Sequence, residues 1–387
     1  MEKVLKLQEK INSDFLKGKT KTGIKSFILE RRKFNWIIKN TNKKSRFYNL
    51  YSIQRKIDYV EGNLKLNKFL IGYYKTSNPR QLIDIVNYRN KLSRKLGYSG
   101  YLDLYMSKLK LEGIDEGIFK KIDNLIINKI LSLSKYVHKY NNTLSLSEND
   151  FNLIIKSIDS IVYRDVYSTC DIKYLNTNDG SITIYMPETN KNIIRVSYLT
   201  DVDKIEYLVH ELGHAYETLS IGIVDRQKYK IFINSELQEC IPGIVEGDFL
   251  KNLLRKDKVL FLKMYDHFKD IVTFIPYLYL KFKFEQFLYT SDNLNEKIIN
   301  NQWNELVKLY MPHQLGNENF NWINKFNNVD DPFVELKYLF GKICALLSLL
   351  SVEKCCENIK KFWNVGFDFS SFLEQNLSAL EALNKLT

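Results

Sequence analysis

The stretch VHELGHAYE at residues 209–217 constrains this chain more than any other, because it contains the pattern H-E-x-x-H. Positions i and i+4 lie one turn apart on the same face of an α-helix, so His210 and His214 can present imidazole nitrogens to one ion. Glu211 projects from a neighbouring angle, within reach of a water molecule on that ion. Two histidine ligands and a glutamate general base are the signature of zinc hydrolases.

The residues around this motif predict a helix. Thr200 and Asp201 are candidate N-caps, Asp203 adds an acid to the first turn, and apolar residues then recur at helical spacing. Gly213 inside the helix costs about 1 kcal/mol relative to alanine, which is explained if another segment packs closely against it. A histidine on an apolar helix face is often only a core residue. Two of the five histidines occur in this motif, however, and we expect a metal site.

A third ligand is expected downstream, because a catalytic zinc has three protein ligands and keeps a fourth position for water. The segment NSELQECIPGIVEGD at 234–248 offers Glu236, Glu239 and Glu246, which share a face if the segment is helical. They follow His214 by 22, 25 and 32 residues, and spacing alone does not choose among them. Apolar neighbours predict a buried helix, in which an acid needs a partner.

HELGHA, followed by a glutamate and by another acid seven residues later, resembles the thimet oligopeptidase and oligoendopeptidase F family of zinc peptidases. The resemblance implies that the first of the two acids binds zinc. Glu239 and Glu246 have the seven-residue separation, so the resemblance selects Glu239 as the third ligand of one zinc ion. Glu246 is then expected to hold a ligand in place.

The segment YRNKLSRKLGYSGYLDLYMSKL at 88–109 is similar to a second stretch of the same family. Its pattern predicts a helix, a glycine C-cap and another helix that starts near Tyr101, with a role in packing rather than chemistry. The matching residues are Arg89, Asn90, Gly97, Tyr98, Tyr101 and Asp103.

The segment NVDDPFVELKYLFGKICALLSLL at 328–350 resembles the part of the family that supplies a His and Tyr hydroxyls to the oxyanion of the tetrahedral intermediate. Here the His position falls on Asn328, and two Tyr positions fall on Val334 and Leu336. Tyr338 is therefore the surviving candidate donor. Possible replacements, each more readily explained as structural, are His267, His313, Tyr277 and Tyr279.

The periodicity of the remaining chain predicts a mainly α-helical protein. Helices are expected near 2–16, 23–40, 44–60, 80–96, within 115–160, and through 250–290 and 295–311. Residues 161–199 are rich in β-branched and aromatic side chains, which predicts a small antiparallel sheet directly before the H-E-x-x-H helix. In the resembling family an edge strand beside the metal binds the peptide, and residues 181–186 and 193–198 are the candidates.

The resemblance implies a two-lobed, zincin-type peptidase with a deep cleft. We expect an N-terminal helical lobe at 1–165 and a catalytic zinc-binding lobe at 166–387. The N-terminal region is shorter than in the family, where this lobe restricts entry to short peptides. Such a restriction is therefore not implied for this chain.

The charge and cysteine content limit the expected partners and location. The net charge is +12, but its basic residues are spread along the chain, and the densest run, at 30–47, is interpreted as a solvated helical face rather than a nucleic-acid site. Five cysteines disfavour a disulfide framework. No apolar stretch reaches the roughly 18 residues that span a bilayer, and the first residues lack a signal-peptide pattern. We expect a cytoplasmic protein without a membrane or nucleic-acid partner.

The function implied by the resemblance is that of a zinc metalloendopeptidase acting on oligopeptides. The ion would polarise a peptide carbonyl and acidify a water molecule, Glu211 would carry the proton to the leaving amine, and Tyr338 would support the oxyanion. One alternative is a zinc carboxypeptidase-type exopeptidase, which needs a cation for the terminal carboxylate of its substrate. Another is a peptide-binding or dedicated peptide-processing protein with weak turnover, as the missing donors suggest. The presence of Glu211 argues against that last alternative.

Overall fold

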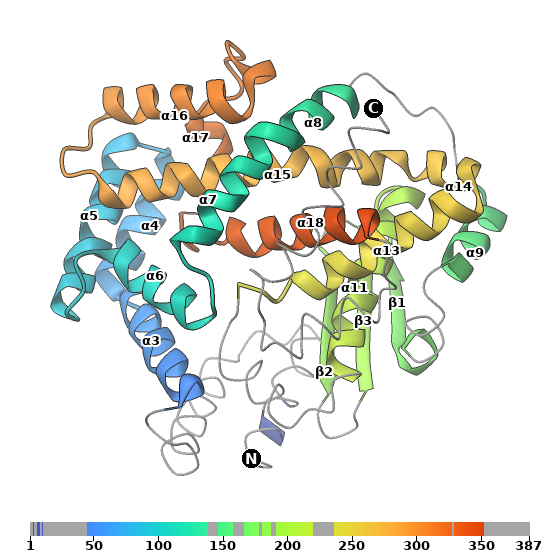
Figure 1. Cartoon of the computed structure of the whole chain (residues 1–387). Helices are drawn as coiled ribbons and strands as arrows, with labels where there is room; N and C mark the ends of the chain where they lie inside the picture. Colours follow the sequence, from blue (N-terminus) through green and yellow to red (C-terminus); the bar gives the residue numbers. More distant parts are fainter. Residues whose placement is uncertain are drawn as a thin grey trace.

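The computed structural model describes residues 45–137, 146–157, 166–177, 180–186, 191–219, 236–326 and 329–351, together with a few of the first ten. Within these ranges the chain is mainly helical and has one small sheet (Figure 1). The helices expected near 2–16 and 23–40, and most of the basic run at 30–47, lie outside the described residues. None of the described helices is both long enough and apolar enough to cross a membrane.

Short helices joined by short loops make up the first part of the described chain. The helices expected at 44–60 and 80–96 are confirmed as α3 and α5, whereas the helix between them was not predicted. Helix α5 begins after the N-cap Asn78 with Pro79 at its first position, where a proline is well tolerated. The elements are α3 (Arg46–Glu61), α4 (Leu64–Thr76), α5 (Pro79–Lys95), α6 (Tyr101–Leu111), α7 (Glu116–Leu125), the π-helical η1 (Ile126–Ile130), α8 (Leu131–Val137) and α9 (Glu148–Ser157).

The segment at 88–109 has the packing role expected from its sequence. Helix α5 ends before Gly97, whose φ of 90° is a left-handed conformation that suits glycine, and α6 starts at Tyr101. The Asn90 side chain joins these elements, because its Oδ1 accepts from the Tyr101 N–H at 2.8 Å and its Nδ2 donates to the Tyr289 carbonyl at 3.2 Å.

A 3-10 turn, η2 (Tyr167–Thr169), leads into three strands, β1 (Asp171–Leu175), β2 (Ile182–Met186) and β3 (Lys191–Ser197), in the order β1-β3-β2. The prediction of a purely antiparallel sheet was wrong for one pair: β2 and β3 are antiparallel, but β1 and β3 are parallel. The reason is that the chain passes from β1 to the far edge before it turns back, so β3 enters the middle of the sheet in the direction of β1. Of the two candidate edge segments, 181–186 contains the edge strand and 193–198 the central one.

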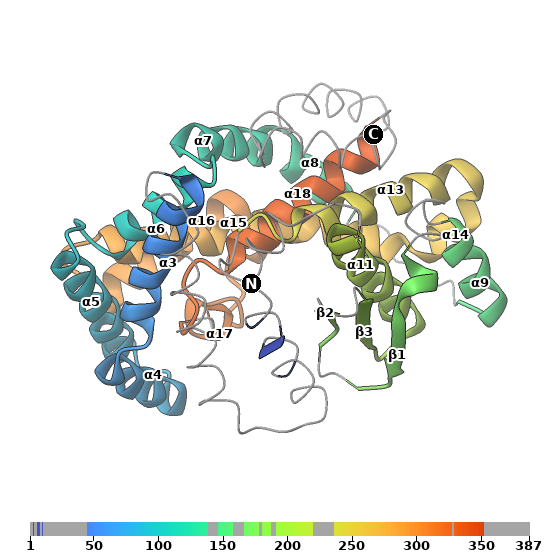
Figure 2. The ribbon, with the colours of Figure 1, turned by 90° about the horizontal axis from the view of Figure 1, so that it is seen from below.

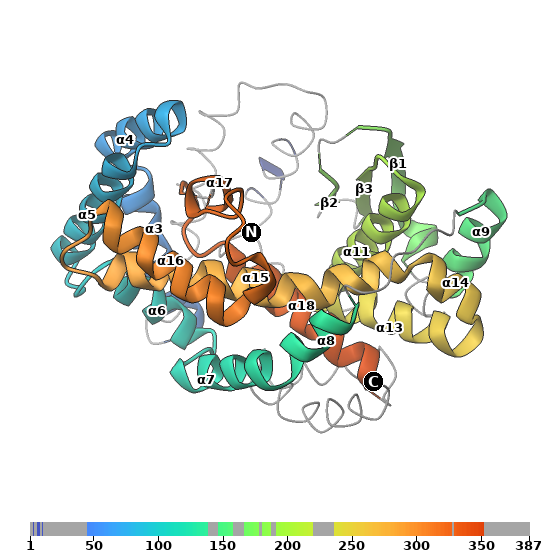
Figure 3. The same cartoon turned by 90° about the horizontal axis from the view of Figure 1, so that it is seen from above.

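The last part of the described chain is again helical, as predicted for 250–290 and 295–311. Helices α15 and α18 lie side by side along the length of the molecule (Figures 1 and 3). Helices α3 to α6 gather at one end, and α11, α13 and the sheet at the other (Figure 2). The elements are α11 (Asp201–Leu219), α13 (Cys240–Lys256), α14 (Lys258–Lys263), α15 (Tyr265–Thr290), α16 (Glu296–Tyr310), η3 (Pro312–Gln314), α17 (Trp322–Lys325) and α18 (Glu335–Leu350).

Close approach between α11, α13 and α18 depends on glycines. A Cβ atom added at Gly213 would lie 2.4 Å from the Pro242 Cα, which confirms that another segment packs tightly against this part of α11. A Cβ at Gly341 of α18 would lie 2.9 Å from the Cβ of Glu239. Contacts this short are not possible for real side chains, so the three helices reach this spacing only with glycine at both positions.

Candidate metal centre

Helix α11 presents the histidines of the H-E-x-x-H motif on one face. It starts with reciprocal bonds: the Thr200 Oγ1 accepts from the Asp203 N–H at 3.1 Å, and the Asp203 Oδ2 accepts from the Thr200 N–H at 3.0 Å. Thr200 is thus the N-cap, and the helix continues past both histidines. The rings of His210 and His214 lie 4.9 Å apart and are nearly perpendicular.

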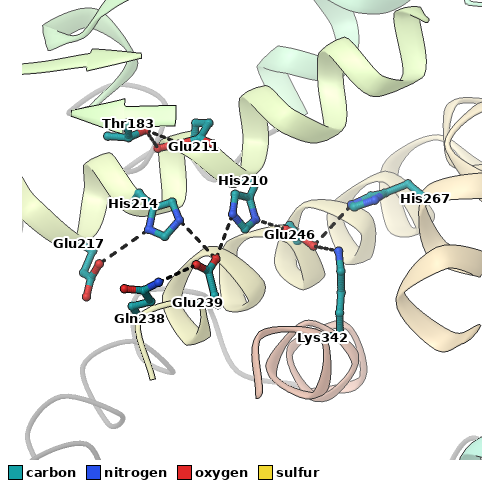
Figure 4. A network of polar contacts seen from close by, with 10 residues as sticks. All are labelled: Thr183, His210, Glu211, His214, Glu217, Gln238, Glu239, Glu246, His267 and Lys342. Carbon is teal, nitrogen blue, oxygen red and sulfur yellow. Dashed lines mark hydrogen bonds and ion pairs between the residues drawn. The ribbon is translucent and has the colours of Figure 1, made fainter. Parts of the chain in front are cut away.

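Glu239 lies in the turn that leads into α13 and points at both rings (Figure 4). Its Oε2 atom is 3.1 Å from the His210 Nε2 and 3.4 Å from the His214 Nε2. The ligand atoms of the three residues all lie within 4.8 Å of one another, and they form the only group of this kind among the described residues. The structure therefore brings together the two histidines and the acid that the resemblance selected.

The three residues fit a divalent metal such as zinc. Zinc bonds of about 2.0–2.2 Å require neighbouring ligands about 3.3–3.6 Å apart, since a tetrahedron's edge is about 1.63 times its centre-to-corner distance. The two distances from the Glu239 Oε2 are close to this value. That oxygen is also buried without a hydrogen-bond donor among the described residues. A buried carboxylate oxygen without a donor is costly, and a cation at this point would satisfy it.

The electrostatics of the three residues also favour a cation. Burial alone would lower the pKa of His210, but the neighbouring Glu239 and Glu246 carboxylates outweigh it and raise the pKa well above its ordinary value. Burial would raise the pKa of Glu239, but the neighbouring His214 and His210 outweigh it and lower the pKa well below its ordinary value. The acids around the rings attract positive charge, whether it is carried by protons or by a metal ion.

Glu246 lies on the outer side of His210, where it was expected to hold a ligand. The His210 Nδ1 donates to the Glu246 Oε1 at 2.5 Å, which leaves Nε2 facing Glu239. The Glu246 Oε2 accepts from the Lys342 Nζ at 3.1 Å and is 3.9 Å from the His267 Nε2. Although burial disfavours its ionised form, the neighbouring Lys342 and His210 lower the pKa of Glu246.

Glu236, which spacing alone left as a candidate ligand, has a different partner. Its Oε1 accepts from the Lys108 Nζ at 2.7 Å in a buried ion pair. This pair joins α6 to the turn that carries Glu239, so Glu236 anchors the segment rather than facing the histidines.

Some residues around the centre were missed from the sequence, because only the fold brings most of them there. The Thr183 Oγ1 of β2 donates to the Glu211 Oε2 at 2.7 Å, and the Lys342 of α18 holds Glu246. The Glu217 carboxylate lies 4.0 Å from the His214 Nδ1. Glu217 alone had a local signal, since it follows His214 by three residues on the same helix face.

Tyr338 lies on α18 one turn before Lys342, on the same face of that helix, and is 45% exposed. No hydrogen bond joins its hydroxyl to another described residue. Asn328 lies outside the described residues.

Three of the four possible replacement donors are placed by contacts elsewhere in the fold, and the fourth, His267, lies on the far side of Glu246 from His210. The Tyr277 and Tyr279 hydroxyls donate to the carbonyls of Lys325 and Phe119. His267 is fully buried with its Nδ1 3.1 Å from the Glu206 Oε1, and His313 is on the exposed turn η3.

Comparison with protein families gives no match, and neither does comparison with curated proteins. Solved structures do match. The Pyrococcus furiosus carboxypeptidase has a TM-score of 0.58 at 13% identity, with 98% of this chain and 89% of that chain covered. For the Trypanosoma cruzi metallocarboxypeptidase 1 the TM-score is 0.55 at 12% identity, with 97% and 91% covered.

A Bacillus anthracis protein assigned as an oligoendopeptidase F matches with a TM-score of 0.55 at 13% identity, covering 83% of this chain and 64% of that chain. The chain thus spans less than two thirds of that protein. At such identities the likeness shows the fold alone. The predicted fold class is confirmed: a mainly helical, zincin-type peptidase fold with a small sheet beside the helix that carries His210 and His214.

Proposed function

We propose that this chain is a zinc-dependent metallopeptidase that hydrolyses oligopeptides, with His210, His214 and Glu239 as the ligands of one ion. The main support for the proposal is the convergence of two imidazole nitrogens on a buried carboxylate oxygen that has no hydrogen-bond donor among the described residues. Two histidines and one glutamate are a ligand set of catalytic zinc, which leaves a fourth position open to water.

When bound, a zinc ion acts as a Lewis acid that polarises a carbonyl and lowers the pKa of a water molecule. The protein supplies the movement of protons. Glu211 takes a proton from the attacking water, whose oxygen bonds to the carbonyl carbon. Glu211 then delivers that proton to the amine as the C–N bond breaks, so the products are an amine and a carboxylic acid, which releases its own proton at neutral pH.

Other residues are proposed to position the metal ligands and the substrate for this step. Glu246 bonds to the Nδ1 of His210 and keeps its Nε2 turned toward Glu239. Glu217 lies on the Nδ1 side of His214, at 4.0 Å. Tyr338, whose hydroxyl bonds to none of the described residues, is proposed to donate a hydrogen bond to the oxyanion. The edge strand β2, which has β3 as its single strand neighbour among the described residues, is proposed to pair with an extended peptide.

Cleavage within a peptide is the first candidate, as the resemblance of the motifs implies. Removal of C-terminal residues is the second, and one observation favours it: the chain matches the two carboxypeptidases over nearly their whole length, but less than two thirds of the oligoendopeptidase. This reading requires a cation near the centre for the terminal carboxylate. The nearest lysine identified there, Lys342, already holds Glu246.

The test is mass spectrometry of a peptide library incubated with the zinc-loaded protein, with Glu211→Gln and a chelator-treated sample in parallel. The library contains each peptide with a free and with an amidated C-terminus. Internal cuts in both forms support the endopeptidase, whereas stepwise losses confined to free C-termini support the carboxypeptidase. Cleavage by Glu211→Gln at the wild-type rate would contradict the proposed mechanism. If the metal-loaded protein binds peptides but cleaves none of them, the proposal that the chain is a peptidase is wrong.

A further inference from the structure

Thr183 is a polar link between the sheet and the proposed general base. Its Oγ1 lies 2.7 Å from the Glu211 Oε2 and 3.0 Å from the main-chain oxygen of the same residue (Figure 4). Both of these atoms are acceptors, so the hydroxyl hydrogen is directed toward Glu211 in either arrangement. The carboxylate at 2.7 Å is the closer and, as an ion, the stronger acceptor.

The fold fixes the position of this hydroxyl. Thr183 pairs with Ile194 across the antiparallel strands β2 and β3, so both side chains point to the same face of the sheet. Ile194 is fully buried, and both strands pack on α11, which places Thr183 against that helix. A threonine side chain is branched at Cβ and has few rotamers in a strand, so its hydroxyl is a rigid donor.

Glu211, by contrast, has a long side chain on a helix, and its position is not set by α11 alone. It is buried, with 5% of its surface exposed, and one carboxylate oxygen is held by Thr183. Among the described residues no side chain bonds to the other oxygen, Oε1. That oxygen is therefore the one free to accept a proton from water.

We propose that Thr183 is the positioning residue that orients the Glu211 carboxylate, by holding Oε2 so that Oε1 faces the attacking water. This inference rests on the proposed function. It adds a residue from the sheet, outside the H-E-x-x-H helix, to those that control proton transfer by Glu211. The role is geometric: the Thr183 hydroxyl acts through Glu211, whereas pairing of β2 with a peptide would use main-chain atoms.

Three variants test the inference. Thr183→Val keeps the shape and strand preference but removes the hydroxyl, and Thr183→Ser restores a hydroxyl. Thr169→Val is the matched control, because it removes another threonine hydroxyl bond, to the Val166 carbonyl, in the turn before β1. Each variant is measured for kcat and KM on a peptide that the wild type cleaves, and for zinc affinity by competition with a chelator.

We expect Thr183→Val to lower kcat by about ten- to a hundredfold, because a misplaced base loses its alignment with the water. KM and zinc affinity should not change, Thr183→Ser should regain most of the rate, and Thr169→Val should behave as wild type. Full kcat in Thr183→Val would overturn the inference. A loss that serine does not rescue, or that comes with weaker zinc binding, would show a structural role instead.

A readout without activity separates this inference from the proposed function. Crystal structures of the wild type and Thr183→Val should show the Glu211 carboxylate in different positions. If the wild type cleaves no peptide, the proposed function fails while the crystallographic comparison still decides the role of Thr183. An unchanged Glu211 position in Thr183→Val overturns the inference even if the wild type is an active peptidase.

Discussion

Two buried polar clusters in this protein are built on opposite principles. In the Arg89 cluster, the guanidinium is bound by groups of the chain itself: Glu61, Tyr289 and the Val329 carbonyl. In the His210 cluster, formed by His210, His214, Glu239 and Glu246, two imidazole nitrogens face a carboxylate oxygen without a donor. The first cluster is complete without a ligand and contributes to stability. In the second, no described residue donates to that oxygen, an arrangement that is typical of a binding centre.

This comparison predicts that the two clusters respond differently to mutation, and Arg89→Met should have the largest effect on stability. Arg89 is fully buried, and its loss leaves Glu61, Tyr289 and a main-chain carbonyl without their donor. We expect the free energy of unfolding to fall by about 3 kcal/mol, the lower end for breaking a buried pair, since Glu61 reaches solvent. Chemical denaturation measures the change.

Metal binding provides the control for Arg89→Met. The folded variant should bind zinc with wild-type affinity, because its cluster lies between α3, α5 and α15 rather than beside the histidines. Unchanged stability, or a loss of zinc affinity at temperatures where the variant is folded, would show that the two clusters are not separate in this way.

The second prediction concerns the His210 cluster and its cation, Lys342. Lys342→Met removes the donor to the Glu246 Oε2, so Glu246 holds the Nδ1 of His210 less firmly. Loss of such an outer partner typically lowers metal affinity about 10- to 100-fold, and we expect this range for zinc. Competition with a chromophoric chelator measures it.

Lys251→Met is the matched control for this effect. Lys251 is a lysine at the same helix pair, buried between α13 and α18, where it pairs with Asp248 at 2.7 Å and reaches the Ser348 carbonyl. Its removal should lower stability but leave zinc affinity unchanged. Equal losses of affinity in both variants would mean that the packing of α13 on α18, rather than the Lys342–Glu246 contact, controls the centre.

Local sequence signals explain which parts of this centre could be predicted. The spacing of His210 and His214 and the cap at Thr200 are features of a single helix, and such local features can be recognised from periodicity and capping residues. Spacing alone left three acids as candidates for the third ligand, and Glu239 was selected by the resemblance to a known family. The structure distinguishes them by partner: Glu236 meets Lys108 and Glu246 meets the outer nitrogen of His210.

Contacts that cross the fold could not be predicted. Thr183 meets Glu211 over 28 residues of sequence, and Lys342 meets Glu246 over 96. Nothing in their own segments marks them. The parallel pairing of β1 with β3 was missed for a similar reason, because strand order depends on the path of the chain and not on the composition of a strand. Helix α4 was a different miss: its N-cap, Asn63, gave a local signal that was not used.

The smallest effect is expected at the start of α11, ten residues before His210. Thr200→Ala removes the hydroxyl that accepts from the Asp203 N–H, and a lost N-cap costs about 1 kcal/mol. Thr200→Ser should restore the stability, and thermal unfolding with and without zinc measures both variants. We expect equal zinc affinity in the wild type and the alanine variant, because the partners of the His210 and His214 rings come from the other end of α11 and from α13. A fall in zinc affinity like that of Lys342→Met would instead mean that fraying at the first turn of α11 reaches the histidines. The stability of the helix would then control the geometry of the metal ligands.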